Sequence, residues 1–306
     1  MIPVVFSTDH NYIMPTTVAI QSLVQCTNDD ILHIYILQSE NVTDEDRKIL
    51  HNAVMSKKEN KVDFISVGTV FDNVYEIRGI SKATYFRLFI PWIIDDWDYI
   101  FYLDGDIIVK SSLAPLYKEI QQRRGNEYIY GIRTPGFTTD VYYIEHIKSL
   151  NLEPNCYING GVQILNAKEM RADNLKERMM PLINEQFFFQ DQDIINIVCE
   201  GRKGFIPLKY NFYNGVSEDI KEKYLSSGAC NEKDYDEAIK EPIIIHYAGK
   251  KPWNGFTHHW YDWWSVYAKS NVYSAEFEDK ITREILNPHY STKQLIKMSL
   301  KQILKK

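Results

Sequence analysis

The sequence predicts an α/β fold built around a mostly parallel sheet. Short β-branched runs at 4–9, 31–37 and 62–67 are typical of strands, and helical patterns occupy 16–26 and 43–58 between them. Strands that alternate with helices in this way usually pair in parallel. The first run ends in polar residues, which we expect at the carboxyl edge of the sheet, where α/β sheets bind ligands. These residues are Ser7, Thr8, Asp9 and Asn11.

Composition limits the classes of protein to consider. The 306 residues are 44% hydrophobic and 25% charged, enough for one large α/β domain with an appendage or for two domains. A formal charge of -6 argues against a general nucleic-acid binder. The cysteines are scattered without zinc spacing, so we expect reduced thiols. With no run of 18 apolar residues and no charged segment of a signal peptide at the start, we expect a cytoplasmic protein.

The run 98–109 is the stretch that most suggests chemistry. It is apolar and typical of a buried strand, yet it contains Asp104 and Asp106 with Gly105 between them. Since a strand interior tolerates charge poorly, we expect the pair at the strand's C-terminal end, facing a cleft. Two such carboxylates could share a divalent cation that bridges a diphosphate, and Gly105 would let a ligand approach the backbone. The alternative is an acidic turn without any metal.

The remaining elements follow from local patterns. Thr43 is expected to cap the second helix, because acids occupy its first turn. Segment 82–89 is predicted to be helical, with Arg87 either clamping a phosphate or ribose in the cleft or forming a structural ion pair. Further helices are expected from 111 and at 141–150, 167–180 and 191–200, and further strands at 128–132, 162–165 and 242–246.

Three later segments carry candidate site residues, each with an alternative. The Asn159-Gly160-Gly161 turn removes side chains where a ligand could pass close to the backbone, or it is a simple hairpin-type turn. The run Gln190–Asp193 places Asp191 or Gln192 at a helix N-terminus, where an acid could equally be an N-cap. His246 ends a strand close to Gly249 and Lys251, so it could be a third metal ligand beside a phosphate-binding lysine, or a structural histidine.

The C-terminal tail differs in character from the rest of the chain. Segment 291–306 has five lysines, no acid and regularly spaced apolar residues. As a helix it would be basic and amphipathic, suited to an anionic membrane surface. An apolar stripe that docks on the body of the protein explains it equally well.

Taken together, the motifs resemble glycosyltransferase family 8, which includes bacterial lipopolysaccharide α-galactosyl- and α-glucosyltransferases and glycogenin. The resemblance covers roughly residues 1 to 265 and rests on the order and spacing of the motifs. In chain order they are Ser7-Thr-Asp-His-Asn-Tyr12, Lys82-x-x-Tyr-x-Arg87, Leu103-Asp-Gly-Asp106, Asn159-Gly-Gly-Val162, Gln190-Asp-Gln-Asp193 and His246-x-x-Gly-x-Lys-Pro-Trp253.

The resemblance implies a GT-A catalytic domain over 1–270, followed by a helical, basic amphipathic tail over 271–306. The implied reaction is metal-dependent, retaining transfer of galactose or glucose from a UDP-sugar to a hydroxyl of a cell-surface glycan, with Mn²⁺ as the usual metal and Mg²⁺ as an alternative. Other acceptors consistent with the resemblance are a protein, or a tyrosine of the chain itself as in glycogenin. A non-catalytic protein that has kept the fold, either as a nucleotide-sugar-binding protein or as a scaffold, is the alternative from another class.

Residue roles follow from the same resemblance. Asp104, Asp106 and His246 would bind the metal. Asp9, Asn11 and the backbone near Ser7 and Thr8 would hold uracil and ribose, and Gly249 and Lys251 the diphosphate. Arg87, Asp191 and the turn Asn159-Gly160-Gly161 would face the donor sugar. Gln192 would lie opposite the leaving group, and because an amide is a poor nucleophile we favour front-face attack, with Gln192 stabilising the transition state.

The chain departs from the family pattern in three places. The loop 131–135 lacks the carboxylate with which many members contact the donor sugar, so the donor's identity is open. The lysine motif is one residue shorter than usual, and Lys251 is assigned by its place before Pro252. Gly79 stands where some members have a diphosphate-binding histidine.

Overall fold

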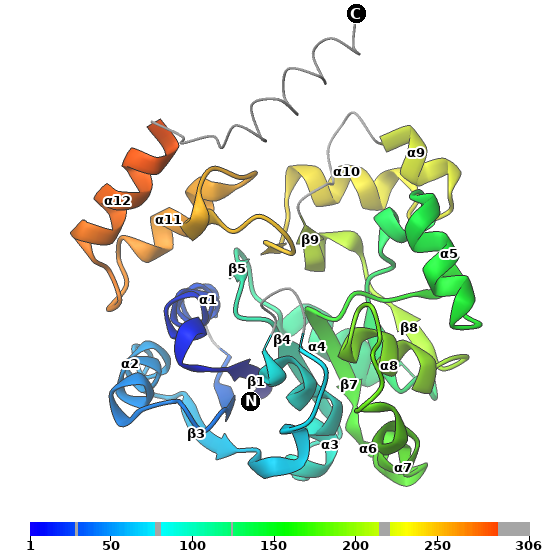
Figure 1. Cartoon of the computed structure of the whole chain (residues 1–306). Helices are drawn as coiled ribbons and strands as arrows, with labels where there is room; N and C mark the ends of the chain where they lie inside the picture. The colour runs from blue at the N-terminus through cyan, green and yellow to red at the C-terminus, as the bar shows by residue number, and fades with distance from the viewer. Residues whose placement is uncertain (28–29, 77–80, 124, 214–220, 287–306) are drawn as a thin grey trace, which may run out of the picture.

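A seven-stranded sheet forms the centre of the protein in the computed structural model, which describes residues 1–27, 30–76, 81–123, 125–213 and 221–286. Among the described strands, every neighbouring pair in this sheet is parallel except the two pairs made by β7. The predicted α/β fold with a mostly parallel sheet is therefore confirmed (Figure 1). In spatial order the strands are β3 (Lys61–Ser66), β2 (Leu32–Gln38), β1 (Ile2–Thr8), β4 (Tyr99–Leu103), β7 (Val162–Asn166), β6 (Ile129–Gly131) and β8 (Lys203–Phe205).

The strand order reverses between β1 and β4, which fixes where a ligand can enter. From β1 the chain moves outward to β2 and β3, and it then returns to the other side of β1 as β4, with Val4 opposite Phe101. Helices that leave neighbouring strands in opposite directions open a crevice at the carboxyl ends of those strands. Thr8 and Leu103 end these two strands, so the residues that follow them lie at this crevice.

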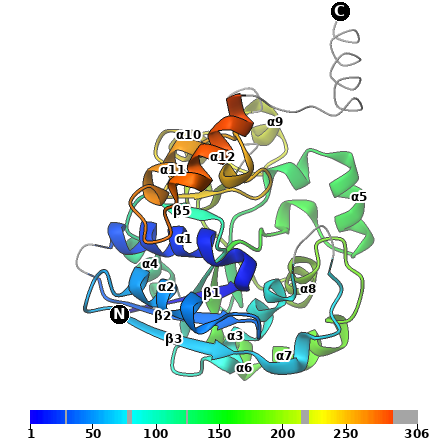
Figure 2. The same ribbon diagram turned by 60° about the vertical axis from the view of Figure 1, so that its left-hand side comes forward.

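Two layers of helices cover the faces of the sheet (Figures 1 and 2). Alternation along the strands sends side chains to both faces: Phe6 and Phe101 belong to one apolar core, whereas Val5 and Tyr102 belong to the other. The first core also contains residues of α1 (Ile13–Cys26), α2 (Asp44–Val54) and α4 (Ala114–Gln122). The second contains residues of the 3₁₀ helix η3 (Lys82–Phe89) and of α3 (Ile90–Ile93), α6 (Ala167–Ala172), α7 (Leu175–Met179) and α8 (Asp191–Val198).

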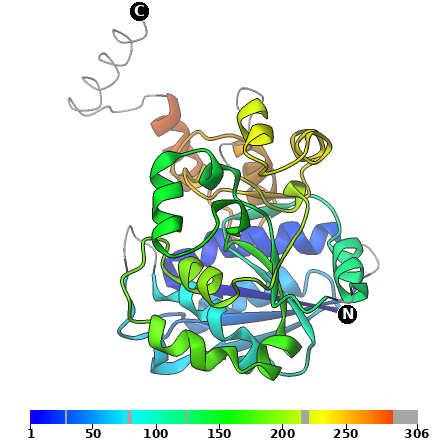
Figure 3. The same cartoon turned by 90° about the vertical axis from the view of Figure 1, so that its right-hand side faces the viewer.

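A second, three-stranded sheet lies beside the crevice. Its strands are β5 (Ile107–Val109), β10 (Ile244–His246) and β9 (Phe212–Tyr213), in that order. Around it lie α9 (Lys221–Ser226), α10 (Glu232–Lys240), α11 (Trp260–Tyr267) and α12 (Ala275–Leu286), at the end of the molecule away from α3, α6 and α7 (Figures 1 and 3). Helix α5 (Val141–Ser149) forms a smaller apolar cluster with the loop that precedes β7.

The strand predicted in the run 98–109 ends at the acidic pair as expected, but a second strand in the other sheet follows the pair. β4 ends at Leu103, and after a bend at Asp104–Asp106 the chain continues as β5, which pairs with β10. A Cβ on Gly105 would lie 2.5 Å from Thr16 Oγ1 on α1 and 3.2 Å from the Tyr12 ring. Packing against α1 is thus one reason for glycine at this bend, while the approach of a ligand to Gly105 stays a prediction.

Two predicted helices are shorter than expected, each for a visible reason. The helix predicted over 43–58 ends at Val54, whose carbonyl accepts a hydrogen bond from the Asn60 side chain at 3.2 Å. The helix predicted over 167–180 divides into α6 and α7, because Asn174 adopts a left-handed backbone with φ 47°. The segment 82–89 is helical as predicted, but of the 3₁₀ type.

The last described helix packs on the body of the protein. The Phe277 ring of α12 stacks on Trp264 of α11 with centroids 6.0 Å apart, and Ile281 is buried. Gly79 and the predicted basic tail 291–306 lie outside the described residues. Within the described part of the chain, every helix is too short or too polar to cross a lipid bilayer.

Candidate active site

Three metal-ligating side chains converge where the two sheets meet. Asp104 and Asp106 occupy the bend between β4 and β5, and the antiparallel pairing of β5 with β10 brings His246 opposite Ile107. One ligand atom from each side chain can be chosen so that all three lie within 4.8 Å of one another. His246 Nε2 is 3.8 Å from Asp104 Oδ2 and 3.4 Å from Asp106 Oδ1. Residues 104, 106 and 246, predicted as one ligand set, are therefore neighbours in the fold.

The chemistry of these atoms fits a divalent cation. Asp106 Oδ1 is buried and has no hydrogen-bond partner among the described residues, which is costly for a carboxylate oxygen unless a cation binds it. His246 Nδ1 lies 2.9 Å from Asn211 Oδ1, an acceptor, so Nδ1 donates a hydrogen bond there and Nε2 is the ring nitrogen that faces the two carboxylates and could ligate a cation. Two carboxylates and one imidazole suit an ion such as Mn²⁺ or Mg²⁺.

The Asn159-Gly160-Gly161 turn lies directly against this cluster. A Cβ on Gly161 would lie 2.8 Å from Asp104 Oδ2 and 2.8 Å from His246 Nε2, so only glycine leaves the ligand atoms accessible here. Asn159 Oδ1 accepts hydrogen bonds from Gly161 N at 2.9 Å and from Asn211 Nδ2 at 2.9 Å. The turn is therefore tied to the same asparagine that orients His246, and it is more than a simple strand connection.

Arg87 connects the cluster of Asp104, Asp106 and His246 to the start of α8. This buried guanidinium pairs with Asp104 at 2.9 Å and with Asp191 at 2.8 Å, and it lies 4.3 Å above the Tyr102 ring. Burial would lower the pKa of Arg87, but the two carboxylates outweigh it and the pKa is raised. The predicted alternative of a structural ion pair is thus confirmed, while a direct contact of Arg87 with a donor remains a prediction.

Asp191 is a buried carboxyl with one oxygen left for a ligand. Its Oδ1 accepts a hydrogen bond from Thr84 Oγ1 at 2.8 Å. Its Oδ2 lies beside Arg87 Nε, but that N–H is directed to the Thr84 carbonyl at 3.0 Å, so Oδ2 has no donor among the described residues. Burial raises the pKa of Asp191 to about 6, an effect that Arg87 partly offsets. A ligand hydroxyl could supply the missing donor.

Helix α8 begins at Asp191, as predicted, but its cap is arranged differently. Gln190 is the N-cap residue, with φ 50°, so neither Asp191 nor Gln192 is an N-cap. The Asp193 carboxylate accepts the Phe189 backbone N–H at 2.8 Å across this start. Gln192 turns to the glycine turn instead, where its Oε1 accepts from Gly160 N at 2.7 Å.

Lys251 approaches the metal cluster from the loop after β10. Its ammonium forms an ion pair with Asp106 Oδ2 and donates to the Tyr247 carbonyl at 2.7 Å. Burial opposes ionisation of Asp106, but Lys251 and His246 outweigh it and lower the pKa of that carboxyl. Gly249 lies in the exposed part of the same loop. Lys251 is therefore close enough to the cluster to contact a metal-bound phosphate.

The polar residues after β1 have local partners of their own. Asp9 Oδ1 accepts from the backbone N–H groups of Asn11 at 2.8 Å and Tyr12 at 3.1 Å, which caps the 3₁₀ turn η1 (His10–Tyr12). Thr8 Oγ1 lies 3.2 Å from Thr16 Oγ1. The buried Ser7 Oγ has no partner among the described residues, and Asn11 is exposed. The capping function of Asp9 is therefore established, whereas contact with a nucleoside stays a prediction.

Sequence reasoning missed several residues that hold the site together. Thr84 bonds both Arg87 and Asp191, Asn211 orients His246, and Tyr157 bonds the α8 start. A weak signal existed for Asn211, an amide within the aromatic run 210–213. No pattern in the sequence singles out Thr84 or Tyr157, because the acids that they bond, Asp191 and Asp193, lie far away along the chain.

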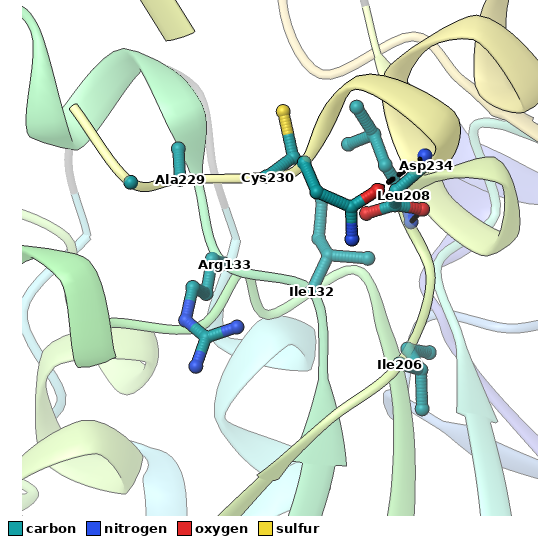
Figure 4. A pocket seen from close by; sticks show the side chains of 9 residues that line it. Ile132, Arg133, Ile206, Leu208, Ala229, Cys230 and Asp234 are labelled. Atoms are coloured by element: carbon teal, nitrogen blue, oxygen red, sulfur yellow. Dashed lines mark hydrogen bonds between the residues drawn. The ribbon is translucent and has the colours of Figure 1, made fainter. Parts of the chain in front are cut away.

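A separate cavity of about 330 Å³ opens at the carboxyl ends of β6 and β8 (Figure 4). Its walls combine the buried Ile132, Ile206 and Leu208 with the more polar Arg133, Cys230 and Asp234. Asp234 is already engaged, because its Oδ1 accepts the Leu208 backbone N–H at 2.8 Å. The lining contains none of the predicted site residues.

The arrangement can now be compared with known proteins. A model of the family described as glycosyl transferase family 8 matches residues 3–257. The chain belongs to this family. A putative glycosyltransferase of Haemophilus influenzae is 31% identical over 253 residues, which is 80% of this chain and 71% of that protein. The lipopolysaccharide glucosyltransferase WaaO of Escherichia coli is 22% identical over 313 residues, 99% of this chain and 85% of WaaO.

Solved structures of glycosyltransferases share the fold of this family member. The apo structure of the bifunctional glycosyltransferase WbbM superposes with a TM-score of 0.77 and 25% identity, over 94% of this chain and 52% of the WbbM chain. The galactosyltransferase LgtC in complex with donor and acceptor sugar analogs superposes with a TM-score of 0.74 and 22% identity, over 91% of this chain and 100% of LgtC. These neighbours confirm the expected GT-A fold.

Proposed function

We propose that the protein transfers galactose or glucose from a UDP-sugar to a hydroxyl of a cell-surface glycan, with retention of the anomeric configuration and formation of an α-linkage. The observation that carries this proposal is the cluster of Asp104, Asp106 and His246 at the switch point of the sheet, with Lys251 beside it. Relationship to the lipopolysaccharide glucosyltransferase WaaO supports a glycan or glycolipid acceptor.

The proposed roles use the groups that the site leaves available. Asp104, Asp106 and His246 would hold Mn²⁺ or Mg²⁺, which neutralises charge on the departing UDP. Lys251, with the backbone at Gly249, would contact the diphosphate and add to that electrostatic stabilisation. Ser7, Thr8, Asp9 and Asn11 would bind uracil and ribose. Asp191 Oδ2 would accept a hydroxyl of the donor sugar, next to Arg87 and the turn 159–161.

Retention of the anomeric configuration depends on which group attacks the sugar and from which face. The group proposed to lie opposite the leaving phosphate is Gln192, whose amide oxygen is a poor nucleophile. In front-face attack the acceptor hydroxyl oxygen would bond to the anomeric carbon on the face from which UDP leaves, so no covalent enzyme intermediate is needed. The leaving phosphate would accept the proton of that hydroxyl. Gln192 Oε1 would then stabilise the positive charge that develops on the sugar ring.

The proposed setting is the cytoplasmic face of the membrane, where lipid-linked acceptors can be reached. We divide the chain into a catalytic domain over 1–270 and a C-terminal segment over 271–306. The five lysines of 291–306 would bring the enzyme to anionic lipid as a peripheral protein.

The experiment that tests this function is UDP release from a panel of UDP-sugars, with Mn²⁺ and with chelator. Wild type is compared with Asp106→Ala and with a matched control, Asp95→Ala, which removes an exposed carboxylate. We expect release from one sugar, abolished by chelator and by Asp106→Ala but not by Asp95→Ala. A wild type that neither releases UDP nor binds it in calorimetry would leave the non-catalytic alternative.

A further inference from the structure

A continuous chain of hydrogen bonds runs from α5 to the glycine turn of the site. His146 Nε2 lies 3.0 Å from Asp193 Oδ2, and the Tyr157 hydroxyl donates to Asp193 Oδ1. Gln192 Nε2 donates to Tyr157 Oη at 3.3 Å, and Gln192 Oε1 accepts from Gly160 N at 2.7 Å. The chain thus connects a fully buried acid with the side chain proposed to act on the donor sugar.

These partners determine which end of the Gln192 carboxamide faces which way. The Tyr157 hydroxyl has one proton and gives it to Asp193, so its oxygen can only accept from Gln192. Burial first, and then the charge of Asp193, raise the pKa of Tyr157 well above its usual value, and the hydroxyl keeps that proton. The Gly160 N–H requires an oxygen on the other side of the amide. Both constraints select the same orientation.

Asp193 has no capacity left for chemistry on a substrate. Its Oδ1 is occupied by Tyr157, and its Oδ2 by His146 and the Phe189 backbone N–H. The residue is completely buried, with an exposed fraction of 0%. An acid in this state can orient its neighbours, but it can neither attack a sugar nor remove a proton from an acceptor.

The oriented amide lies beside the charged part of the site. A Cβ on Gly160 would lie 3.3 Å from Gln192 Oε1 and 3.0 Å from Arg87 Nη1, and Arg87 Nη1 donates to the Gly160 carbonyl, so both side chains reach the same residue of the turn. Arg87 in turn pairs with Asp104 of the metal cluster at 2.9 Å. A rotated amide would present its NH₂ group to Gly160 N, so two donors would face each other at that contact.

We propose that Tyr157, anchored by Asp193, is a positioning residue that fixes the Gln192 carboxamide oxygen at the donor site and thereby sets the rate of transfer. Asp193 is a positioning residue of the same unit, not a nucleophile or base. This inference rests on the proposed function, because it takes Gln192 Oε1 as the group that stabilises the reacting sugar. Donor and metal binding use other residues and should not depend on Tyr157.

Tyr157→Phe removes the hydroxyl and keeps the ring in its apolar cluster, so it isolates the effect. With the best donor from the UDP-release panel, we expect kcat to fall about tenfold, the equivalent of one hydrogen bond, with KM for the donor unchanged. Because Tyr157 acts through Gln192, the double variant Tyr157→Phe, Gln192→Ala should be no slower than Gln192→Ala alone.

The matched control is Tyr117→Phe, which removes a buried hydroxyl that bonds the Tyr99 carbonyl at 2.8 Å in the other core. Both tyrosine variants should lose stability in thermal unfolding, but only Tyr157→Phe should lose kcat. A second readout does not require turnover: the side-chain amide NMR signals of Gln192, identified by their loss in Gln192→Ala, should shift in Tyr157→Phe and stay in place in Tyr117→Phe.

The possible failures can be told apart. An active wild type whose Tyr157→Phe variant keeps full kcat overturns the inference and leaves the proposed function standing. The same holds if the losses of Tyr157→Phe and Gln192→Ala multiply in the double variant. A wild type that neither releases UDP from any sugar nor binds it overturns the proposed function, and this inference with it.

Discussion

At the scale of single residues, Gly161 shows how closely the backbone approaches the metal ligands. A methyl group here would lie 2.8 Å from Asp104 Oδ2 and closer still to the His246 ring, within the space that a cation needs. We expect Gly161→Ala to lose Mn²⁺ affinity in calorimetry and roughly ten- to a hundredfold in UDP release, the size of effect seen when the surroundings of a metal site are disturbed. The protein should still fold, with unchanged circular dichroism.

The control for this prediction is Gly136→Ala. In the described part of the chain, a Cβ on Gly136 would meet Tyr213 Oη at 3.7 Å, an ordinary contact. This variant should bind Mn²⁺ and release UDP as wild type does. Normal Mn²⁺ affinity in Gly161→Ala would show that the cation binds elsewhere.

The raised pKa of Asp191 predicts how activity at the site depends on pH. Burial raises the pKa of its carboxyl from 3.8 to about 6, and its ionised form is the one that could accept a hydroxyl of the donor. We expect kcat/KM to fall as the pH drops below about 6, and this acid limb to be absent in Asp191→Asn, whose activity is lower at every pH. The same limb in wild type and Asp191→Asn would assign it to another group.

The Asp191 carboxyl also makes the free energy of unfolding depend on pH. Because the pKa of Asp191 is higher in the folded protein than in the unfolded chain, the folded state binds its proton more tightly. Its contribution to stability is complete below about pH 4 and is lost as the pH rises through about 6. Urea unfolding of wild type and Asp191→Asn across this window should isolate that contribution.

At the scale of elements, the start of α2 offers a test of capping. Thr43 Oγ1 accepts from Asp46 N at 3.1 Å, and Asp46 Oδ2 accepts from Thr43 N at 2.9 Å, which confirms the cap predicted from sequence. We expect Thr43→Ala to lower the free energy of unfolding by about 1 kcal/mol in urea titration. Thr43→Ser, which keeps the hydroxyl, should cost much less, and equal losses in both variants would argue against the cap.

Elements with a local signal could be predicted, and elements set by long-range pairing could not. The three strands of 4–9, 31–37 and 62–67 and the helix at 141–150 follow periodicities that a short window contains. The division of 98–109 between two sheets depends on β7 and β10, which are distant in sequence. No window around 98–109 could therefore reveal that division.

At the scale of the whole molecule, the candidate site is assembled by the topology of the sheet. Motif order let sequence reasoning name a candidate metal-ligand set, because Asp104 and Asp106 stand in one recognisable segment and His246 in another. Their support could not be named, since Thr84, Tyr157 and Asn211 bond Asp191, Asp193 and His246, which α8 and β10 bring from distant parts of the chain. The candidate ligands could thus be named from residue type and motif order, whereas their arrangement in space required the fold.

The basic segment 291–306 makes membrane binding of the whole chain testable. Segment 291–306 contributes five positive charges with no acid, and a lysine near an anionic bilayer contributes roughly 1 kcal/mol to binding. We expect the full chain to co-sediment with vesicles containing phosphatidylglycerol at low salt, and to be released at high salt. A chain of residues 1–290 should stay in the supernatant while releasing UDP at the wild-type rate.

A variant with glutamine at Lys293, Lys297, Lys301, Lys305 and Lys306 separates charge from length. If charge drives binding, this variant should behave like the truncated chain, and vesicles of phosphatidylcholine alone should bind none of the three proteins. If the segment instead docks on the body of the protein, truncation will lower the free energy of unfolding and leave co-sedimentation unchanged, since its apolar residues are then engaged within the protein. That outcome would show that segment 291–306 stabilises the protein and does not bind the membrane.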